Sequence, residues 1–341
     1  MQFAFTEDQL TINLAAREML ADSCTPADLR RLLESGGPRD EDRWQTVTQM
    51  GLLGMLVPES RGGMGLGLAD FIGIAEAAGY VALPEPLVEL AGITIPLLAS
   101  LDDDQGLLGS AIGGNVVAIG HPANRLVADA DGAVALLLPH GDEVHLVQRV
   151  DVALERAESF DPFRRLFAVE WTPSPATLVA GSWGNAAARG SLFAAAQMIG
   201  LAQRCIDMSV AYAKDRSQFG KPIGSYQAVK HLLANAQVKV EFARPVVHAA
   251  AAELPLGTPA ARARAAHAKI AAGAAADLAA RTAVQVHGAM GITWEVDVHF
   301  FLKRIMALRS AWGAEAAHMA TVIDRIANLP TGPEATFASA L

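Results

Sequence analysis

The stretch DRSQFGKPIGSYQAVKH (Asp215–His231) and the later stretch QVHGAMGITWE (Gln285–Glu295) decide how this chain folds. Alanine-rich sequence with few helix breakers surrounds both, and such sequence favours helices that can approach one another closely. Four helices of this length most simply pack as an antiparallel bundle, with the two stretches near helix ends. We expect these helices at Trp183–Lys214, Ser225–Ala250, Pro259–His287 and Ala311–Ala327.

The region before residue 105 also has a helical pattern. Thr6 and Gln9 have the spacing of a capping box, and an apolar stripe follows them. The cluster at Gly36–Pro38 interrupts the helical pattern, and a further helix is expected around Trp44–Met50. A glycine-rich loop follows Pro58, and helix resumes near Asp70.

The middle of the chain changes to the pattern of short β-strands. Its β-rich runs are Val116–Ile119, Ala133–Leu138, Val144–Val147 and Phe167–Trp171. The sequence therefore predicts a mainly α, α+β protein in three parts. These parts are an N-terminal helical domain (1–105), a small β domain (106–181) and a C-terminal helical bundle (182–341).

Composition narrows the class of protein. The chain has 341 residues, of which 52% are hydrophobic, and a formal net charge of −9. This charge argues against a nucleic-acid surface, since such binding requires clustered Lys and Arg. No apolar run is long enough for a membrane helix, and Cys24 and Cys205 have no metal-ligand spacing. We expect a cytoplasmic protein with no metal, no membrane partner and no nucleic-acid partner.

The two stretches that decide the fold also carry candidate binding chemistry. Arg216 offers a planar fork of donors beside the aromatic ring of Phe219, and Gln285–Ala289 offers backbone amides at a glycine-containing helix end. Such groups suit a pyrophosphate, which carries negative charge. From spacing alone, an ion pair of Arg216 with Asp215 or a helix cap is the favoured interpretation.

Taken together, the two stretches resemble the flavin-binding half of acyl-CoA dehydrogenases. FTEDQ (5–9), GLLGMLVPESRGGMGLG (51–67) and GLAQR (200–204) extend the resemblance over most of the chain. The resemblance implies FAD as cofactor, α,β-dehydrogenation of an acyl-CoA thioester and an electron-transfer flavoprotein as acceptor. It also implies flavin contacts, to a flavin lying mainly on a neighbouring subunit, from Arg216, Gln218, Phe219, Gln227, Gln285, Val286, His287, Gly288 and Ala289.

The catalytic base is where this chain departs from the family pattern. Most members place a glutamate before a Gly-Thr pair, and some supply the base from an earlier helix. Alignment puts Trp312 at the first position and Gly190 at the second, so neither supplies a carboxylate. Glu315 is the nearest acid, although a helix-surface role suits it better. We therefore expect no catalytic residue among the usual positions, with Glu315 as the remaining candidate.

A second departure lies in the β domain. The family carries Thr-Glu-Pro and Gly-Ser-Asp segments there, whereas this chain has GNVVAIGHPANRLVADADG (114–132), and its β domain is shortened. Such short chains are known as subunits of actinobacterial heterotetramers that act on steroid side-chain thioesters. We predict a subunit that completes the flavin site of a longer partner without supplying the base.

Two alternatives remain open. The first is a self-sufficient homomeric flavoenzyme with a non-standard base such as Glu315, acting on an acyl-CoA or on another substrate such as a nitroalkane. The second is a scaffold subunit that binds no flavin. The colour of the purified chain distinguishes them.

Overall fold

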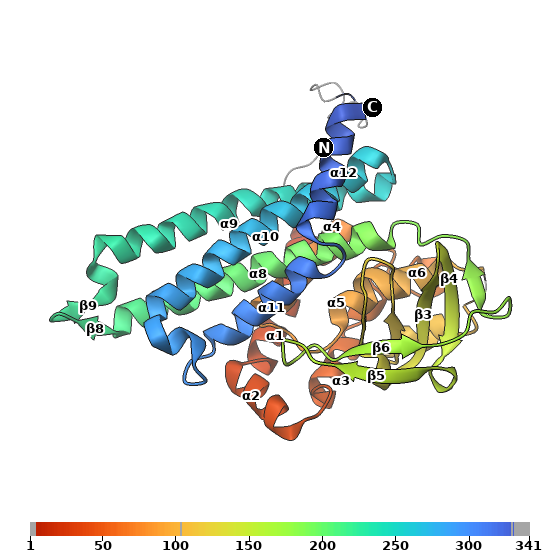
Figure 1. Cartoon of the computed structure of the whole chain (residues 1–341), viewed down its shortest axis with the longest axis horizontal. Coiled ribbons are helices and arrows are strands. Elements are labelled where there is room, and N and C mark those ends of the chain that lie inside the picture. Colours follow the sequence, from red (N-terminus) through yellow and green to blue (C-terminus); the bar gives the residue numbers. More distant parts are fainter. Residues whose placement is uncertain (1–4, 103, 329, 331–341) are drawn as a thin grey trace.

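The computed structural model describes residues 5–102, 104–328 and 330. Long helices form one side of the molecule, and two small sheets lie at the other side, next to the N-terminal helices (Figure 1). The predicted fold class, mainly helical with a small β region, is confirmed. The domain boundaries after residues 105 and 181 stay a prediction.

The N-terminal helices begin at clear capping signals. Thr6 and Gln9 form the predicted capping box, and α1 follows it. The helical pattern before Gly36 contains two helices, because Thr25 caps a new helix whose first residue is Pro26. The helices of this region are α1 (Glu7–Ser23), α2 (Pro26–Ser35), α3 (Glu41–Gln49), α4 (Leu68–Tyr80), α5 (Leu87–Glu89), a π-helical turn η3 (Leu90–Thr94), α6 (Ile95–Ala99) and α7 (Leu107–Ile112).

The β region consists of two small sheets. One has the order β1-β3-β4-β7 and the other β2-β6-β5. β1 is buried along its whole length and pairs in parallel with β3, which in turn pairs antiparallel with β4. The strands are β1 (Val116–Ile119), β2 (Val127–Ala128), β3 (Ala133–His140), β4 (Glu143–Gln148), β5 (Ala153–Ala157), β6 (Leu166–Glu170) and β7 (Leu178–Ala180).

The C-terminal region is built around one long buried helix, α8. Its elements are α8 (Ala186–Asp215), the hairpin β8 (Ser217–Gln218) and β9 (Lys221–Pro222), α9 (Gln227–Glu253), α10 (Pro259–His287), α11 (Val298–Ser310) and α12 (Glu315–Asn328). α10 begins and ends as predicted, since Gly257 is left-handed, Thr258 caps the helix and Pro259 is its first residue. α11, which the sequence pattern does not predict, packs against α8 and α10. α12 also packs against α10, and its C-terminal end projects outward (Figure 1).

Two glycines set the distance between α4 and α8. A Cβ added at Gly200 would lie 1.9 Å from the carbonyl oxygen of Glu76, and one added at Gly79 would lie 2.1 Å from that of Gln197. Only glycine at both positions allows the two helices to approach so closely. The contact joins the N-terminal helices to the bundle and fixes α8, which carries Gly190.

Candidate functional site

The hairpin after α8 presents the first candidate stretch to solvent. Arg216 is exposed, and in the described part of the chain it forms no ion pair with Asp215. Its backbone amide donates to the carbonyl of Tyr212, so the hairpin continues directly from the last turn of α8. Phe219 at the tip is 93% exposed and has a φ of 52°. An unpaired guanidinium beside an exposed ring is available to a ligand or a partner.

The second candidate stretch is joined to the first by a pair of stacked rings. The imidazole of His287 stacks on the ring of Tyr212 with centroids 4.3 Å apart. His287 is buried, its Nδ1 is 2.8 Å from the carbonyl oxygen of Ala283, and desolvation lowers its pKa. This histidine therefore positions the end of α10 against the end of α8, which brings the two candidate stretches to one end of the bundle.

The remaining predicted contact residues divide into exposed and buried groups. Gln218 and Gln227 are exposed on the hairpin and at the start of α9, and Gln285, Gly288 and Ala289 are exposed where α10 ends. Val286 is buried with His287, so its side chain packs in the bundle.

The end of α10 is a glycine turn whose amide, that of Gly288, donates to the carbonyl of Gln285. Gly288 adopts a φ of 62° and a ψ of −142°, a conformation that favours glycine. No atom lies within 4 Å of the position of a Cβ on Gly288, so its surroundings are open. At this end of the bundle the unpaired guanidinium of Arg216 offers a cation to an anionic ligand, and the open turn at Gly288 leaves space beside it.

The two positions where the family pattern places a base lie in direct contact. A Cβ added at Gly190 would lie 2.1 to 2.5 Å from ring atoms of Trp312. The indole therefore occupies the space that a side chain at Gly190 would take. Trp312 is 4% exposed and has a φ of 59°, which is unfavourable for a bulky residue. The surrounding structure must hold it in that conformation.

Several hydrogen bonds hold Trp312 in place. Its backbone amide donates to Oδ1 of Asn124 at 2.7 Å, and its carbonyl accepts from Oγ of Ser191 at 3.2 Å. Just before it, the Lys269 ammonium donates to the carbonyls of Leu308 and Ala311, both at 2.6 Å. Desolvation lowers the pKa of Lys269 to about 7. These contacts fix the segment after α11 at several points.

Two further aromatic rings extend the contact of Trp312 into the β region. His121 lies 5.5 Å from the Trp312 ring and 4.8 Å from the Trp183 ring, between centroids. Its Nδ1 accepts from the amide of Ala123, so a neutral ring carries its proton on Nε2. Burial between these groups lowers the pKa of His121 to about 4. The loop after β1 is thereby closed against Trp312.

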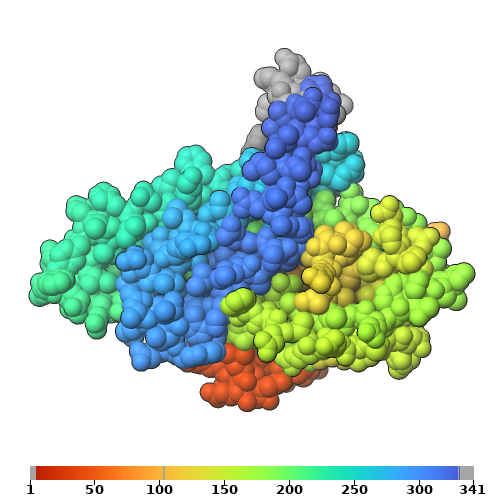
Figure 2. Space-filling view, viewed as in Figure 1, coloured from red at the N-terminus to blue at the C-terminus, as the bar shows by residue number. Residues whose placement is uncertain are grey.

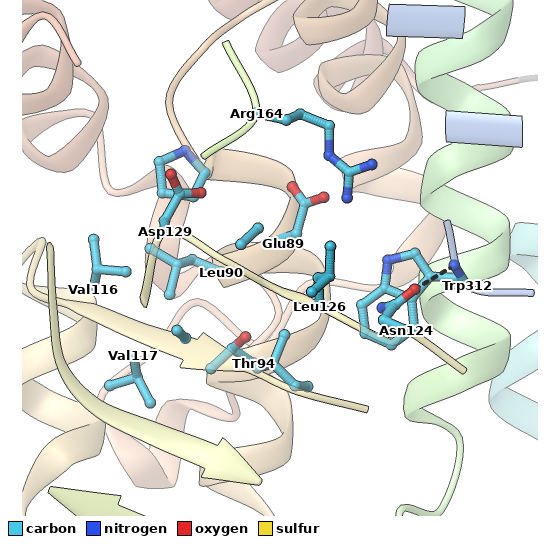
Figure 3. A pocket seen from close by; sticks show the side chains of 14 residues that line it. Glu89, Leu90, Thr94, Val116, Val117, Asn124, Leu126, Asp129, Arg164 and Trp312 are labelled. Atoms are coloured by element: carbon cyan, nitrogen blue, oxygen red, sulfur yellow. Dashed lines mark hydrogen bonds between the residues drawn. The ribbon is translucent and has the colours of Figure 1, made fainter. Parts of the chain in front are cut away.

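The cavity beside Trp312 is too small for a substrate. Its volume is about 30 Å³, and on that measure one water molecule takes up about 10–15 Å³. Figure 3 shows Trp312 and Asn124 at one end and Asp129 at the other, with Glu89 and Arg164 between them. A three-ring flavin or an acyl chain does not fit there, because the indole fills the space next to Gly190.

Two acids in this cavity carry no signal in the sequence. Glu89 comes from the helical segment after Pro86, and Asp129 follows β2 with a φ of 55°. Removal from water, with the Glu89 charge as a further cause, raises the pKa of Asp129 to about 7. A left-handed aspartate is not visible in sequence, so this pair could not have been predicted.

Glu315 lies outside the cavity. It is the first residue of α12, its side chain is 60% exposed, and its carboxylate lies 3.3 Å from Nη2 of Arg309. A general base must reach the reacting carbon and gains basicity from desolvation. An exposed, ion-paired carboxylate has neither property.

The described residues contain neither a candidate metal site nor a reactive cysteine. Among them, no group of three or more His, Cys, Asp or Glu side chains could hold a metal ion. Burial raises the pKa of both Cys24 and Cys205 to about 12, so neither is a ready thiolate nucleophile. None of the described helices is both long and apolar enough to span a bilayer.

Comparison with known proteins identifies the class. Residues 6–101 match the acyl-CoA dehydrogenase N-terminal domain, and residues 185–327 match the acyl-CoA dehydrogenase C-terminal domain. Acyl-CoA dehydrogenase IpdE2 of Mycobacterium tuberculosis is 33% identical over 304 residues, which cover 87% of this chain and 91% of the relative. The chain belongs to the acyl-CoA dehydrogenase family, whose members are oxidoreductases acting on acyl-CoA.

Solved structures share the fold. The ChsE4-ChsE5 complex from Mycobacterium tuberculosis contains a chain that matches with a TM-score of 0.85 and 24% identity, covering 97% of this chain and all of that chain. The Tcur3481-Tcur3483 steroid ACAD G363A variant matches with a TM-score of 0.82 and 22% identity, covering 94% of this chain and 98% of that chain. At these identities the likeness is one of fold.

Proposed function

We propose that this chain is a subunit of an FAD-dependent acyl-CoA dehydrogenase that completes a partner's flavin site and does not itself abstract the substrate proton. The contact between Trp312 and Gly190 carries this proposal, because it removes both base positions and the space beside them. Closure of the loop at His121 and Asn124 supports it, since the cavity left there holds about 30 Å³.

The flavin-binding residues that this chain retains lie where α8 ends, far from Gly190 near its start. In this proposal Arg216 and the Gln285–Ala289 turn bind the pyrophosphate of FAD, and Gln218, Phe219 and Gln227 border it. Bound FAD supplies the acceptor for the substrate hydride. The side chains of His287 and Tyr212 hold the two stretches together, because their rings are stacked on each other.

The partner in this proposal is a longer acyl-CoA dehydrogenase subunit, in a heterotetramer. Both similar solved structures are named as pairs of different proteins, and one is named as a steroid ACAD. We accordingly propose acyl-CoA esters with a steroid side chain as substrates of the partner's site. An electron-transfer flavoprotein would serve as acceptor, in the cytoplasm.

Exposed apolar side chains on the bundle support an assembly with another chain. Phe242 on α9 is 75% exposed, and Leu232 and Val238 on the same helix are also exposed. α12 exposes Ile323 and Ile326, and its upper end projects beyond the body of the molecule in Figure 2. Large exposed apolar side chains on these two helices are candidates for contacts with another chain.

The flavin spectrum of two preparations tests the proposal. The chain purified alone should be colourless, and the chain co-produced with a longer dehydrogenase from the neighbouring gene should co-purify with it and be yellow. A chain that is yellow alone and reduces an acceptor dye with an acyl-CoA would be a homomeric enzyme. A complex whose flavin content does not depend on this chain would leave it as a scaffold.

One structural observation favours the alternative of a homomeric enzyme that has its own base. Asp129 and Glu89 lie in the cavity that Trp312 lines, and the raised pKa of Asp129 is what a general base near neutral pH requires. For that alternative to hold, the indole would have to move away from Gly190 to admit substrate.

A further inference from the structure

One tryptophan stands in water, in the turn between α10 and α11. Trp294 is 59% exposed, whereas Trp44, Trp183 and Trp312 are buried and Trp171 is half-buried. Because an indole has a large apolar surface, covering it with another molecule is favourable. The exposed indole is therefore a candidate anchor for a partner.

Trp294 is held in place although it is exposed. Its carbonyl accepts from Nη2 of Arg30 at 2.8 Å, and Nε of the same arginine donates to the carboxylate of Asp297 at 2.7 Å. The indole meets the His299 ring edge to face at 4.6 Å between centroids, and the Lys303 ammonium lies 5.0 Å from its centroid. A side chain fixed in this way loses little conformational freedom when a partner binds it.

Other apolar side chains are exposed at the same end of the molecule. Ile292, in the same turn, is 68% exposed, and Phe219 lies at the tip of the β8–β9 hairpin. Figure 1 shows this hairpin and the turn between α10 and α11 at one end of the long helices. The hydroxyl of Tyr212, near the end of α8, lies 3.8 Å from Sδ of Met290, so the hairpin and the turn are joined through these two residues.

This end of the molecule is also basic. Residues 214–230 contain four basic side chains and one acidic side chain, Asp215, hence a net charge of +3 in a chain whose net charge is −9. None of the four cations forms an ion pair in the described part of the chain. They are Lys214, Arg216, Lys221 and Lys230. An acidic surface is the complementary partner for this end.

We propose that Trp294 is the anchor by which this chain binds its longer dehydrogenase partner. The indole enters an apolar pocket on an acidic surface of that partner, and the cations of residues 214–230 face the acidic groups around the pocket. A tryptophan in such a pocket typically carries a large share of the binding energy. This inference rests on the proposed function, since it takes the partner to be the chain whose flavin site this end completes.

Calorimetric titration of the full-length chain with the longer dehydrogenase from the neighbouring gene tests the anchor. Trp294→Ala should weaken association about tenfold or more. Ile292→Asp, which adds a charge beside the indole, and Lys230→Glu, which reverses a cation, should each weaken it several-fold. Association of the wild-type chains should also weaken when the salt concentration rises from about 50 to about 300 mM.

Two exposed residues of the β region provide matched controls. Phe160 is an exposed ring and Arg156 an exposed cation without an ion pair in the described residues. Phe160→Ala and Arg156→Glu should leave the affinity unchanged.

A spectroscopic measurement reports on the indole itself. The chain is labelled with 5-fluorotryptophan, and its ¹⁹F resonances are recorded alone and with the unlabelled partner. Trp294→Phe identifies the resonance of Trp294. That resonance should shift on binding and should lose its sensitivity to exchange of H₂O for D₂O, because the ring leaves water.

The anchor is overturned if Trp294→Ala binds within twofold of the wild type, or if the Trp294 resonance remains sensitive to D₂O in the complex. It is also overturned if Trp294→Ala weakens binding only to the flavin-loaded partner and not to the partner stripped of flavin, because the ring would then contact the flavin. Should Trp294→Ala destabilise the free chain, Ile292→Asp and Lys230→Glu decide, and wild-type affinity in both would exclude this surface.

Failure of the anchor is distinguishable from failure of the proposed function. Wild-type affinity of Trp294→Ala in a complex whose flavin content still depends on this chain would overturn the anchor alone. Wild-type chains that do not associate at all would overturn both.

Discussion

The indole of Trp312 lies so close to the backbone of Gly190 that a Cβ on the glycine would be 2.1 Å from a ring carbon. Trp312 therefore stands at the first of the two positions where the family has a base, and its ring also fills the space beside the second, Gly190. The contact excludes a side chain of any size at Gly190. It also explains why the neighbouring cavity is reduced to about 30 Å³.

Gly190→Ala should therefore destabilise the protein. The added methyl overlaps the indole, and overpacking of a buried site typically costs about 1–3 kcal/mol. Urea unfolding measures the change. Gly109→Ala in α7 is the matched control, because a Cβ there meets nothing within 4 Å and alanine favours a helix by about 0.5–1 kcal/mol.

A double substitution identifies the cause of that destabilisation. Trp312→Ala removes the overlapping ring, so Gly190→Ala should cost little in that background. An equal cost of Gly190→Ala with and without Trp312 would show that the two residues do not interact.

His121 should make stability depend on pH. Its pKa is about 4 in the folded protein against an ordinary value of 6.5, so the unfolded chain binds the proton more readily between these values. Stability is then full above pH 6.5 and falls as the pH drops from 6.5 towards 4, by about 3 kcal/mol at most. Unfolding midpoints across this range give the measurement.

The variant His121→Asn separates this residue from other titrating groups. Asparagine keeps an acceptor for the amide of Ala123 and cannot be protonated in this range. The loss of stability between pH 6.5 and 4 should become smaller in the variant. An unchanged dependence of stability on pH would show that groups other than His121 cause the loss.

Much of the fold could be predicted from local signals. The sequence predicts β1 at Val116–Ile119 and α10 at Pro259–His287, with the observed bounds, because a β-rich run and a Gly-Thr-Pro sequence mark them. It does not predict α11, because the start of that helix has no local cap. The carboxylate of Asp297, which precedes it, accepts from Arg30 of α2 at 2.7 Å. That contact depends on tertiary structure.

In the candidate site, too, some residues could be identified from the sequence and others could not. Trp312 and Gly190 could be singled out by their positions in a known pattern, but their contact joins segments far apart in the chain. Lys269, Asn124 and His121, which hold the segment in place, have no periodic or motif signal. Their roles follow from packing alone, which a single sequence does not display.

Arg216→Ala should lower the flavin content of the co-purified complex. Arg216 is exposed and has no ion pair with Asp215 in the described residues, so the substitution should affect ligand binding far more than folding. A lost charge-assisted hydrogen bond is worth about 1.5–3 kcal/mol, or roughly tenfold or more in flavin affinity. The ratio of flavin to protein absorbance after dialysis measures it. Arg31→Ala is the control, and equal flavin in both variants would remove the support for a shared site.

Glu315→Gln should leave turnover of the co-purified complex within about twofold, since an ion pair between exposed groups contributes little. The carboxylate pairs with Arg309 and lies outside the cavity beside Trp312, so it cannot reach a substrate bound there. Glu89→Gln and Asp129→Asn, inside that cavity, should likewise preserve turnover if the base belongs to the partner chain. A loss of several orders of magnitude in one of these three variants, with flavin content unchanged, would instead identify that residue as the base and make this chain the catalytic one.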